Sequence, residues 1–314
     1  MMNIIFTIVG TVVIATVAAL GVWRWSDHRA DAAEHARLLA FQPTAPALFD
    51  PAMVADLPEP ARRYFAFSIA PDTPLYTVAV LTMTGQFSLG TKEAPNYLDM
   101  SATQTLAAPH GFLWKMRAGS GVMRLSGSDS GSWTRFWLLG LAPVARMGGN
   151  DDHRRAAFGR YAAEAVFWAP AALLPGAGIS WEGVDENTAR VTISAGDLEQ
   201  AVDVTVDADG RPLMVQFMRW SDANPDKTHR LQPFGGDLSE FETFAGFTLP
   251  TRVAAGNHYG TDAYFPFFIA KVTDIAFPSQ PGLQQSRAGR SAMAGRGHSR
   301  LIARSNRPPD CPET

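Results

Sequence analysis

The chain has 314 residues, of which 46% are hydrophobic and 18% are charged, and its formal net charge is −3. This near balance of charge argues against a nucleic-acid partner. The single cysteine, Cys311, excludes an intrachain disulfide. The seven histidines show no metal-binding spacing, so we expect no metal and no cofactor. No nucleophile or phosphate-loop motif is present, so the sequence assigns no catalytic residue and favours a protein that is not an enzyme.

An uninterrupted apolar run from Ile4 to Trp23 begins the chain. About twenty apolar residues in a helix cross the ~30 Å hydrocarbon core of a bilayer once. Trp23, Arg24 and Trp25 end the run with side chains that suit the headgroup layer. We therefore predict a transmembrane anchor over residues 1–25, in a single-pass protein of the cell membrane with the lipid bilayer as a partner.

A cleaved signal peptide is the alternative interpretation of this run. Ala30-Asp31-Ala32 fits a small-x-small cleavage site, but the run lacks a basic start and is longer than the apolar core of a usual signal. Length and flanks thus favour a retained anchor. The side of the membrane stays open, because the arginines after the run favour the cytoplasm whereas long domains translocate regardless of flanking charge.

Residues 26–48 form a predicted juxtamembrane linker. Its polar, alanine-rich first part continues the helix to about Leu39, and prolines then favour an extended chain. Two short helical segments follow, one capped by Asp50 and one from Pro60 to Ile69.

From Tyr76 onward the hydrophobic pattern alternates with the period of two that is typical of strands separated by turns. One helix, Arg154–Trp168, interrupts the strands; Gly85 indicates a bulge and Gly127–Gly131 a turn. We predict a mainly β domain with few helices (α+β) over residues 49–278, a curved antiparallel half-barrel-like sheet with the helix on its concave face. The predicted strands are residues 78–89, 97–106, 111–117, 122–126, 132–139, 179–183, 189–194, 200–206, 213–220, 237–244, 251–257 and 265–277.

Four stretches of this domain resemble the uncharacterised bacterial family DUF6544, over about Phe49 to Phe277. They are Leu57-Pro58-x-Pro60-x-x-Arg63-Tyr64-Phe65, Trp137-Leu138-Leu139-Gly140-Leu141-x-Pro143, Arg160-Tyr161-x-x-Glu164-Ala165-x-x-Trp168-x-Pro170-x-x-Leu173-Leu174-Pro175 and Phe247-x-x-Pro250-Thr251. The family has no established activity, so the resemblance implies no catalytic residue. At fold level the pattern is also similar to lipoprotein-carrier half-barrels, which implies a curved sheet wrapped over an apolar cavity.

The helix Arg154–Trp168 contains the best candidate site. Glu164 follows Arg160 by four residues and precedes Trp168 by four, so the three side chains can share a face that overlaps Tyr161. Aromatic residues of the sheet are the other candidates for lining a cavity, although most tryptophans pack in protein cores. The predicted ligand-binding residues are Arg160, Tyr161, Glu164, Trp168, Trp137 and Trp181.

These features favour a membrane-tethered protein of the envelope that binds a hydrophobic or lipid-like ligand. One alternative is an enzyme in which Glu164 acts as an acid or base; the simpler interpretation of this residue is an ion pair with Arg160. A further alternative is a structural scaffold that pairs with another envelope protein through a sheet edge. The oligomeric state is left open.

Residues 279–314 are rich in Gly, Ser, Arg and Pro and poor in large apolar residues. Six arginines against Asp310 and Glu313 give this tail a net charge of +4 and leave −7 for the rest of the chain. We predict a disordered basic tail, because it cannot bury enough apolar surface to fold. A more specific interpretation is an arm that contacts anionic lipid headgroups, worth about 1 kcal/mol per arginine.

Removing residues 279–314 is therefore expected to leave the melting temperature of the protein unchanged within error, since we expect the tail to bury no apolar surface. Calorimetry of the full and truncated chains measures this. A fall of several degrees would mean that the tail packs on the domain.

Overall fold

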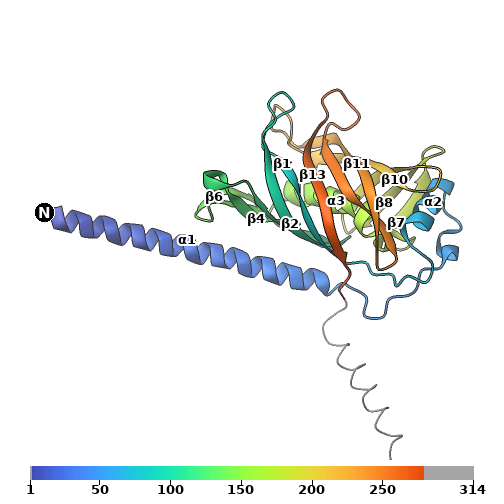
Figure 1. Ribbon diagram of the computed structural model, residues 1–314, viewed down its shortest axis with the longest axis horizontal. Helices are drawn as coiled ribbons and strands as arrows, with labels where there is room; N and C mark the ends of the chain where they lie inside the picture. The colour runs from blue at the N-terminus through green and yellow to red at the C-terminus, as the bar shows by residue number, and fades with distance from the viewer. Residues whose placement is uncertain (1, 279–314) are drawn as a thin grey trace, which may run out of the picture. The chain divides into compact units, whose positions relative to one another are not determined.

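A single antiparallel sheet of thirteen strands makes up most of the fold in the computed structural model, which describes residues 2–278 (Figure 1). The predicted tail, residues 279–314, lies outside the described residues. The strand order is β6-β5-β4-β3-β2-β1-β13-β12-β11-β10-β9-β8-β7. The chain therefore forms two meanders, β1–β6 and β7–β13, that join where β1 pairs with β13. Within the described residues β6 and β7 are edges that do not pair, so the sheet stays open, and the predicted fold class is confirmed.

The strands of the first meander are β1 (Ala79–Ser88), β2 (Tyr97–Ala107), β3 (Gly111–Ala118), β4 (Leu125–Ser130), β5 (Trp133–Leu138) and β6 (Ala142–Gly148). Those of the second are β7 (Ile179–Gly183), β8 (Thr188–Ala195), β9 (Leu198–Val206), β10 (Pro212–Ser221), β11 (Arg230–Phe244), β12 (Phe247–Asn257) and β13 (Phe265–Ala276). The helices are α1 (Met2–Leu39), α2 (Glu59–Ser68) and α3 (Asp151–Trp168), with short 3-10 turns η1 (Pro51–Val54), η2 (Gly121–Met123) and η3 (Pro170–Leu173).

Helix α3 connects the edge strand β6 to the edge strand β7 and lies inside the curve of the sheet, where it contacts β9 and β10 on one side and β2 and β3 on the other (Figure 1). Asn150 caps its start by accepting a hydrogen bond from the backbone N–H of His153 at 2.8 Å. Ala157, Ala162 and Ala165 are among its buried residues, and their small side chains let the helix approach the sheet closely. The helix therefore belongs to the main core rather than to the surface.

The junction of β1 and β13 requires a glycine. Gly85 has a φ of +152°, and a Cβ at this position would lie 2.0 Å from the carbonyl oxygen of Ile269 on β13. The sequence indicated a bulge near Gly85; the register of the β1–β13 pair shifts slightly earlier in the strand, between Thr82 and Met83.

Two local predictions are wrong. Gly127 was expected in a turn but lies within β4, and β6 was not expected as a strand. Ser126, Ser128 and Ser130 have low strand propensity, yet they alternate along β4 toward the outer face. Tertiary packing overrides propensity here, because two of these serines contact the C-terminal half of α1.

This half of α1 docks on the outer face of the first meander. Asp27 accepts hydrogen bonds at 2.9 Å from Nε1 of Trp137 and from Nη2 of Arg146. Asp31 accepts one from the Ser128 hydroxyl at 2.7 Å, and both carboxylates are buried. The fully buried Leu38 packs with Val78, Ala107 and Leu113 below them. The region predicted as a linker thus begins with a helix that is packed on the domain as far as Leu38.

The two buried carboxylates differ in how their charge is compensated. Burial raises the pKa of Asp27, but hydrogen bonds from Arg146 and Trp137 and the nearby arginines outweigh it, so this pKa lies below its ordinary value. Burial also raises the pKa of Asp31, and here the Ser128 hydrogen bond does not compensate, so the net shift is upward. Asp27 therefore stabilises the docked helix as a carboxylate, whereas the charge of Asp31 opposes docking.

Asp27→Asn is expected to cost about 1–3 kcal/mol of unfolding free energy at pH 7, between the values typical of exposed and buried ion pairs. Asp31→Asn serves as the matched variant and is expected to cause no loss, because an amide oxygen still accepts from Ser128. The pKa of Asp31 is higher in the folded protein than its ordinary value of 3.8. The protonated Asp31 therefore contributes fully to the unfolding free energy below that pH, and this contribution is lost as the pH rises through the folded pKa. The benefit of Asp31→Asn should therefore grow from about pH 4 to pH 7 in urea titrations. Equal losses in both variants would contradict this account.

Candidate functional site

A cavity of about 640 Å³ lies between α3 and the inner face of the sheet. Both meanders contribute to its wall, so the pairing of β1 with β13 is needed to form it. Its lining is mostly large and apolar, with Phe87, Trp114, Met116, Phe136, Phe167, Phe217, Phe234, Val253, Phe267 and Phe268 among the residues. A cavity of this size and character falls within the range of small-molecule sites, roughly 300–1,000 Å³.

Strand alternation decides which side chains reach the cavity. On β5, Thr134, Phe136 and Leu138 line it, whereas Trp137 points to the outer face and hydrogen-bonds Asp27 of α1. The same rule on β4 turns Asp129 inward and Ser128 outward to α1. The side chains that bind α1 and those that surround the cavity are therefore alternate residues of the same strands.

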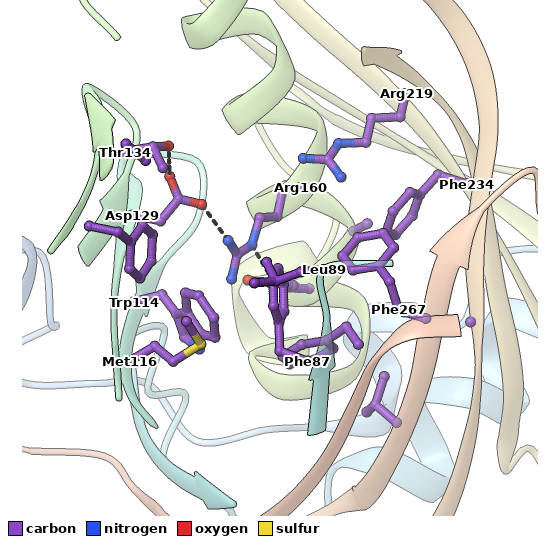
Figure 2. A pocket seen from close by; sticks show the side chains of 18 of the residues that line it. Phe87, Leu89, Trp114, Met116, Asp129, Thr134, Arg160, Arg219, Phe234 and Phe267 are labelled. Atoms are coloured by element: carbon purple, nitrogen blue, oxygen red, sulfur yellow. Dashed lines mark hydrogen bonds and ion pairs between the residues drawn. The ribbon is translucent and has the colours of Figure 1, made fainter. Parts of the chain in front are cut away.

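A cluster of polar side chains interrupts the apolar lining at α3 (Figure 2). Arg160 donates from Nε to Oε1 of Glu164 at 2.8 Å and from Nη1 to Oδ2 of Asp129 at 2.6 Å. Gln104 donates to the other oxygen of Glu164 at 2.6 Å, and Thr134 donates to the other oxygen of Asp129 at 2.5 Å. Every oxygen of the two carboxylates thus already accepts a hydrogen bond.

Arg160 remains charged in this setting. Burial disfavours its cation, but Glu164 and Asp129 outweigh burial and raise the pKa of the guanidinium above its usual value. The guanidinium also lies over the ring of Phe112, with Cζ 4.5 Å from the ring centroid. Its Nη2 makes no hydrogen bond to any residue that the structure describes.

Arg219 is a second arginine of the cavity, and it has no carboxylate partner among residues 2–278 within ion-pair distance. It follows Val215 and Phe217 on the inward face of β10, and its Nε is buried without a hydrogen-bond partner among those residues. Its Cζ lies 4.8 Å from the ring centroid of Phe234. Burial and the nearby charge of Arg160 lower its pKa to about 10. Sequence analysis missed Arg219, although an arginine in phase with Val215 and Phe217 was a signal.

Two further buried polar atoms in this region have no partner among the described residues: Oε1 of Gln104 and Nε1 of Trp114. These residues lie directly opposite each other on β2 and β3, and one atom accepts where the other donates. The acceptor Oε1 of Gln104 and the donor Nε1 of Trp114 are therefore a matched pair of hydrogen-bonding atoms on neighbouring strands. For the donor Nε of Arg219, no unpaired buried acceptor lies opposite it on a neighbouring strand in the described part of the chain.

The structure brings three of the six predicted ligand-binding residues together at the cavity. Arg160, Glu164 and Trp168 line it. Tyr161 is on the same helix but outside the lining, where its hydroxyl donates to the Pro109 carbonyl at 3.3 Å and its ring packs near Phe112.

The two predicted tryptophans of the sheet lie away from the cavity. Trp137 faces α1, as described above. Trp181 on β7 packs against Tyr64 and Phe65 of α2 and donates to the Leu173 carbonyl at 2.9 Å. Contact of any of the six residues with a ligand stays a prediction.

Metal binding has no support in the part of the chain that is described. Within residues 2–278, no group of three or more His, Cys, Asp or Glu side chains is placed to hold an ion.

The fold and the cavity together define an open antiparallel half-barrel with an apolar interior. The chain belongs to DUF6544, a family of unknown function, whose family model matches residues 47–269. The resemblance seen in the sequence is therefore confirmed. No curated protein matches the chain significantly in sequence.

Two solved structures are similar in fold. One is a LolA superfamily protein from Nitrosomonas europaea, at 11% identity and a TM-score of 0.33, covering 71% of this chain and 93% of that protein. The other is a putative outer membrane lipoprotein-sorting protein domain from Vibrio parahaemolyticus, at 12% identity and a TM-score of 0.33, covering 77% and 97%.

Proposed function

We propose that this protein is anchored in a membrane and binds a hydrophobic or lipid-like ligand in the cavity beneath α3. The observation that carries the proposal is the apolar interior itself, about 640 Å³ bounded by aromatic and aliphatic side chains from both meanders. Burial of apolar surface is worth about 25 cal/mol per Å², so a ligand with an acyl chain gains most from such a wall.

Helix α1 supports the membrane location. It is long and apolar enough to cross a bilayer, and nearly all its side chains before Trp23 are exposed. A signal sequence near the N-terminus would pass the same test of length and composition. Cleavage after Ala32 would, however, separate Asp27 and Asp31 from their partners on the sheet and uncover Trp137. The docked half of α1 therefore favours a retained anchor.

Access to the cavity adds a second argument. Met123 of η2 and Leu138 at the end of β5 line the cavity at the loops that follow β3 and β5. Next to them, Val122 and Leu141 are 77% and 60% exposed, which is unusual for large apolar side chains. We name these two loops, residues 119–124 and 139–141, the apolar rim.

The apolar rim lies where α1 leaves the domain. Its two loops are joined by a hydrogen bond from Leu139 N to Arg124 O at 2.8 Å. A Cβ on Gly140 would be 3.5 Å from Cζ of Arg24, the residue that ends the apolar run of α1. If the apolar run of α1 spans the bilayer, the apolar rim lies at the membrane–water interface. A lipid can then enter the cavity without crossing water.

Ligand retained by the full chain is expected in native mass spectrometry after removal of detergent. Ala163→Trp places a large side chain into the cavity from α3 and should lower the bound fraction about tenfold. Val184→Trp, on an exposed site between β7 and β8, adds the same kind of bulk outside the cavity and should leave binding unchanged. A chain that carries nothing and takes up no amphiphile, neutral or anionic, would overturn the proposal.

Removing the apolar rim should affect the rate of loading. Val122→Asp with Leu141→Asp is expected to slow uptake of a fluorescent monoacylglycerol from vesicles by at least about tenfold, because each buried apolar side chain contributes roughly 1.5–3 kcal/mol at the interface. The amount bound at equilibrium should not change, since the cavity wall is intact. Val184→Asp is the control for added charge. An unchanged rate in the double variant would show that the ligand enters elsewhere.

A further inference from the structure

Arg219 is the feature of the cavity that a purely apolar ligand does not explain. Strand alternation sets it among the inward-facing residues of β10, after Val215 and Phe217, and its guanidinium extends from β10 toward α3 (Figure 2). An arginine in this environment is costly unless its donors are satisfied. Its Nε is buried and makes no hydrogen bond to the described residues.

The charges around Arg219 do not satisfy it. Asp129 and Glu164 are the carboxylates that line the cavity, and each ion-pairs with Arg160 and accepts from a neutral side chain at its second oxygen. Arg160 is near enough to disfavour the charge of Arg219, whereas Asp129, Glu164 and Asp222 favour it electrostatically. None of these carboxylates lies within ion-pair distance of Arg219 in the described part of the chain. The cation–π contact with Phe234 stabilises one face of the guanidinium but supplies no hydrogen-bond acceptor.

We infer that the cavity takes an amphiphile with an anionic head group, a carboxylate or a phosphate, which pairs with Arg219 while its apolar chain lies against the aromatic wall. The inference rests on the proposed function and specifies the ligand class. A guanidinium presents a planar fork of donors that matches the oxygens of both anions. The Nη2 of Arg160, which bonds to none of the described residues, offers a further donor to the same cavity.

The position of Arg219 fits this role. It lies two residues before the end of β10, and β10 ends at the same end of the antiparallel sheet as β3 and β5, whose following loops form the apolar rim. An anionic head at Arg219 is therefore toward the loop end of the cavity, and the chain of the ligand can occupy the space between Trp114, Phe136 and Phe268.

Three photoactivatable probes with the same sixteen-carbon chain test the inference on the full-length protein in amphipol. They are diazirine-labelled palmitate, palmitoyl lysophosphatidate and the neutral monopalmitoylglycerol, and peptide mapping counts only label attached to cavity residues. Arg219→Leu should weaken labelling by one or both anionic probes about 10- to 100-fold, because hydrogen bonds to charged groups are the stronger class. The neutral probe should bind Arg219→Leu at least as well, which also shows that the variant is folded.

The controls separate the possible results. Arg219→Lys should retain part of the preference for anions, and Arg230→Leu, at an exposed arginine outside the cavity, should change nothing. Loss confined to the lysophosphatidate would assign a phosphate head, and loss confined to palmitate a carboxylate. Equal effects on charged and neutral probes, or no effect, would overturn the inference while leaving the proposed function in place. Failure of all three probes to label the cavity of the unmodified chain would overturn both.

Discussion

The pairing of β1 with β13 is the contact on which the rest of the architecture depends. Each meander forms from strands that are neighbours in the chain, whereas β1 and β13 are separated by almost the whole domain. Gly85 allows the close approach at this junction, since any side chain there would meet the backbone of Ile269. Without this ladder the cavity would have no continuous wall, because its lining comes from both meanders.

Helix α3 packs on both meanders, and more extensively on β9 and β10 than on β2 and β3. Gly159 faces β9 and β10, where an added Cβ would lie 2.7 Å from Oε1 of Gln200, and Ala162 beside it is fully buried. Small residues thus draw the helix toward the second meander. Toward the first meander, Arg160 and Glu164 reach Asp129 and Gln104, and the aromatic residues of β3 and β5 line the cavity on this side. The cavity lies between this unevenly packed helix and the open sheet.

Much of the fold was predictable from local pattern. Period-two alternation located most strands, the capped helix before Pro170 was evident, and the family resemblance held. What alternation cannot tell is which of the two faces is inner. Trp137 was expected at a cavity and lies against α1, since an outer face that is covered by a helix also buries large side chains. The serines of β4 did not indicate a strand, because the partners of Ser128 and Ser126, Asp31 and Arg24, are far away in the chain. The phase of Arg219 with Val215 and Phe217 indicated an inward side chain, but no local pattern shows that its Nε lacks a partner among the described residues.

One consequence follows from the continuity of α1 as a single helix from Met2 to Leu39. If a flexible hinge joined the anchor to the domain, the domain would move freely around the anchor and could carry a ligand away from the membrane. Here the helix runs unbroken into its docked half, held by Asp27 and Leu38. For an anchored chain this fixes the orientation of the cavity to the bilayer. Under the proposed function, the domain would stay at the membrane, and any acceptor of the ligand would have to come to the membrane to collect it.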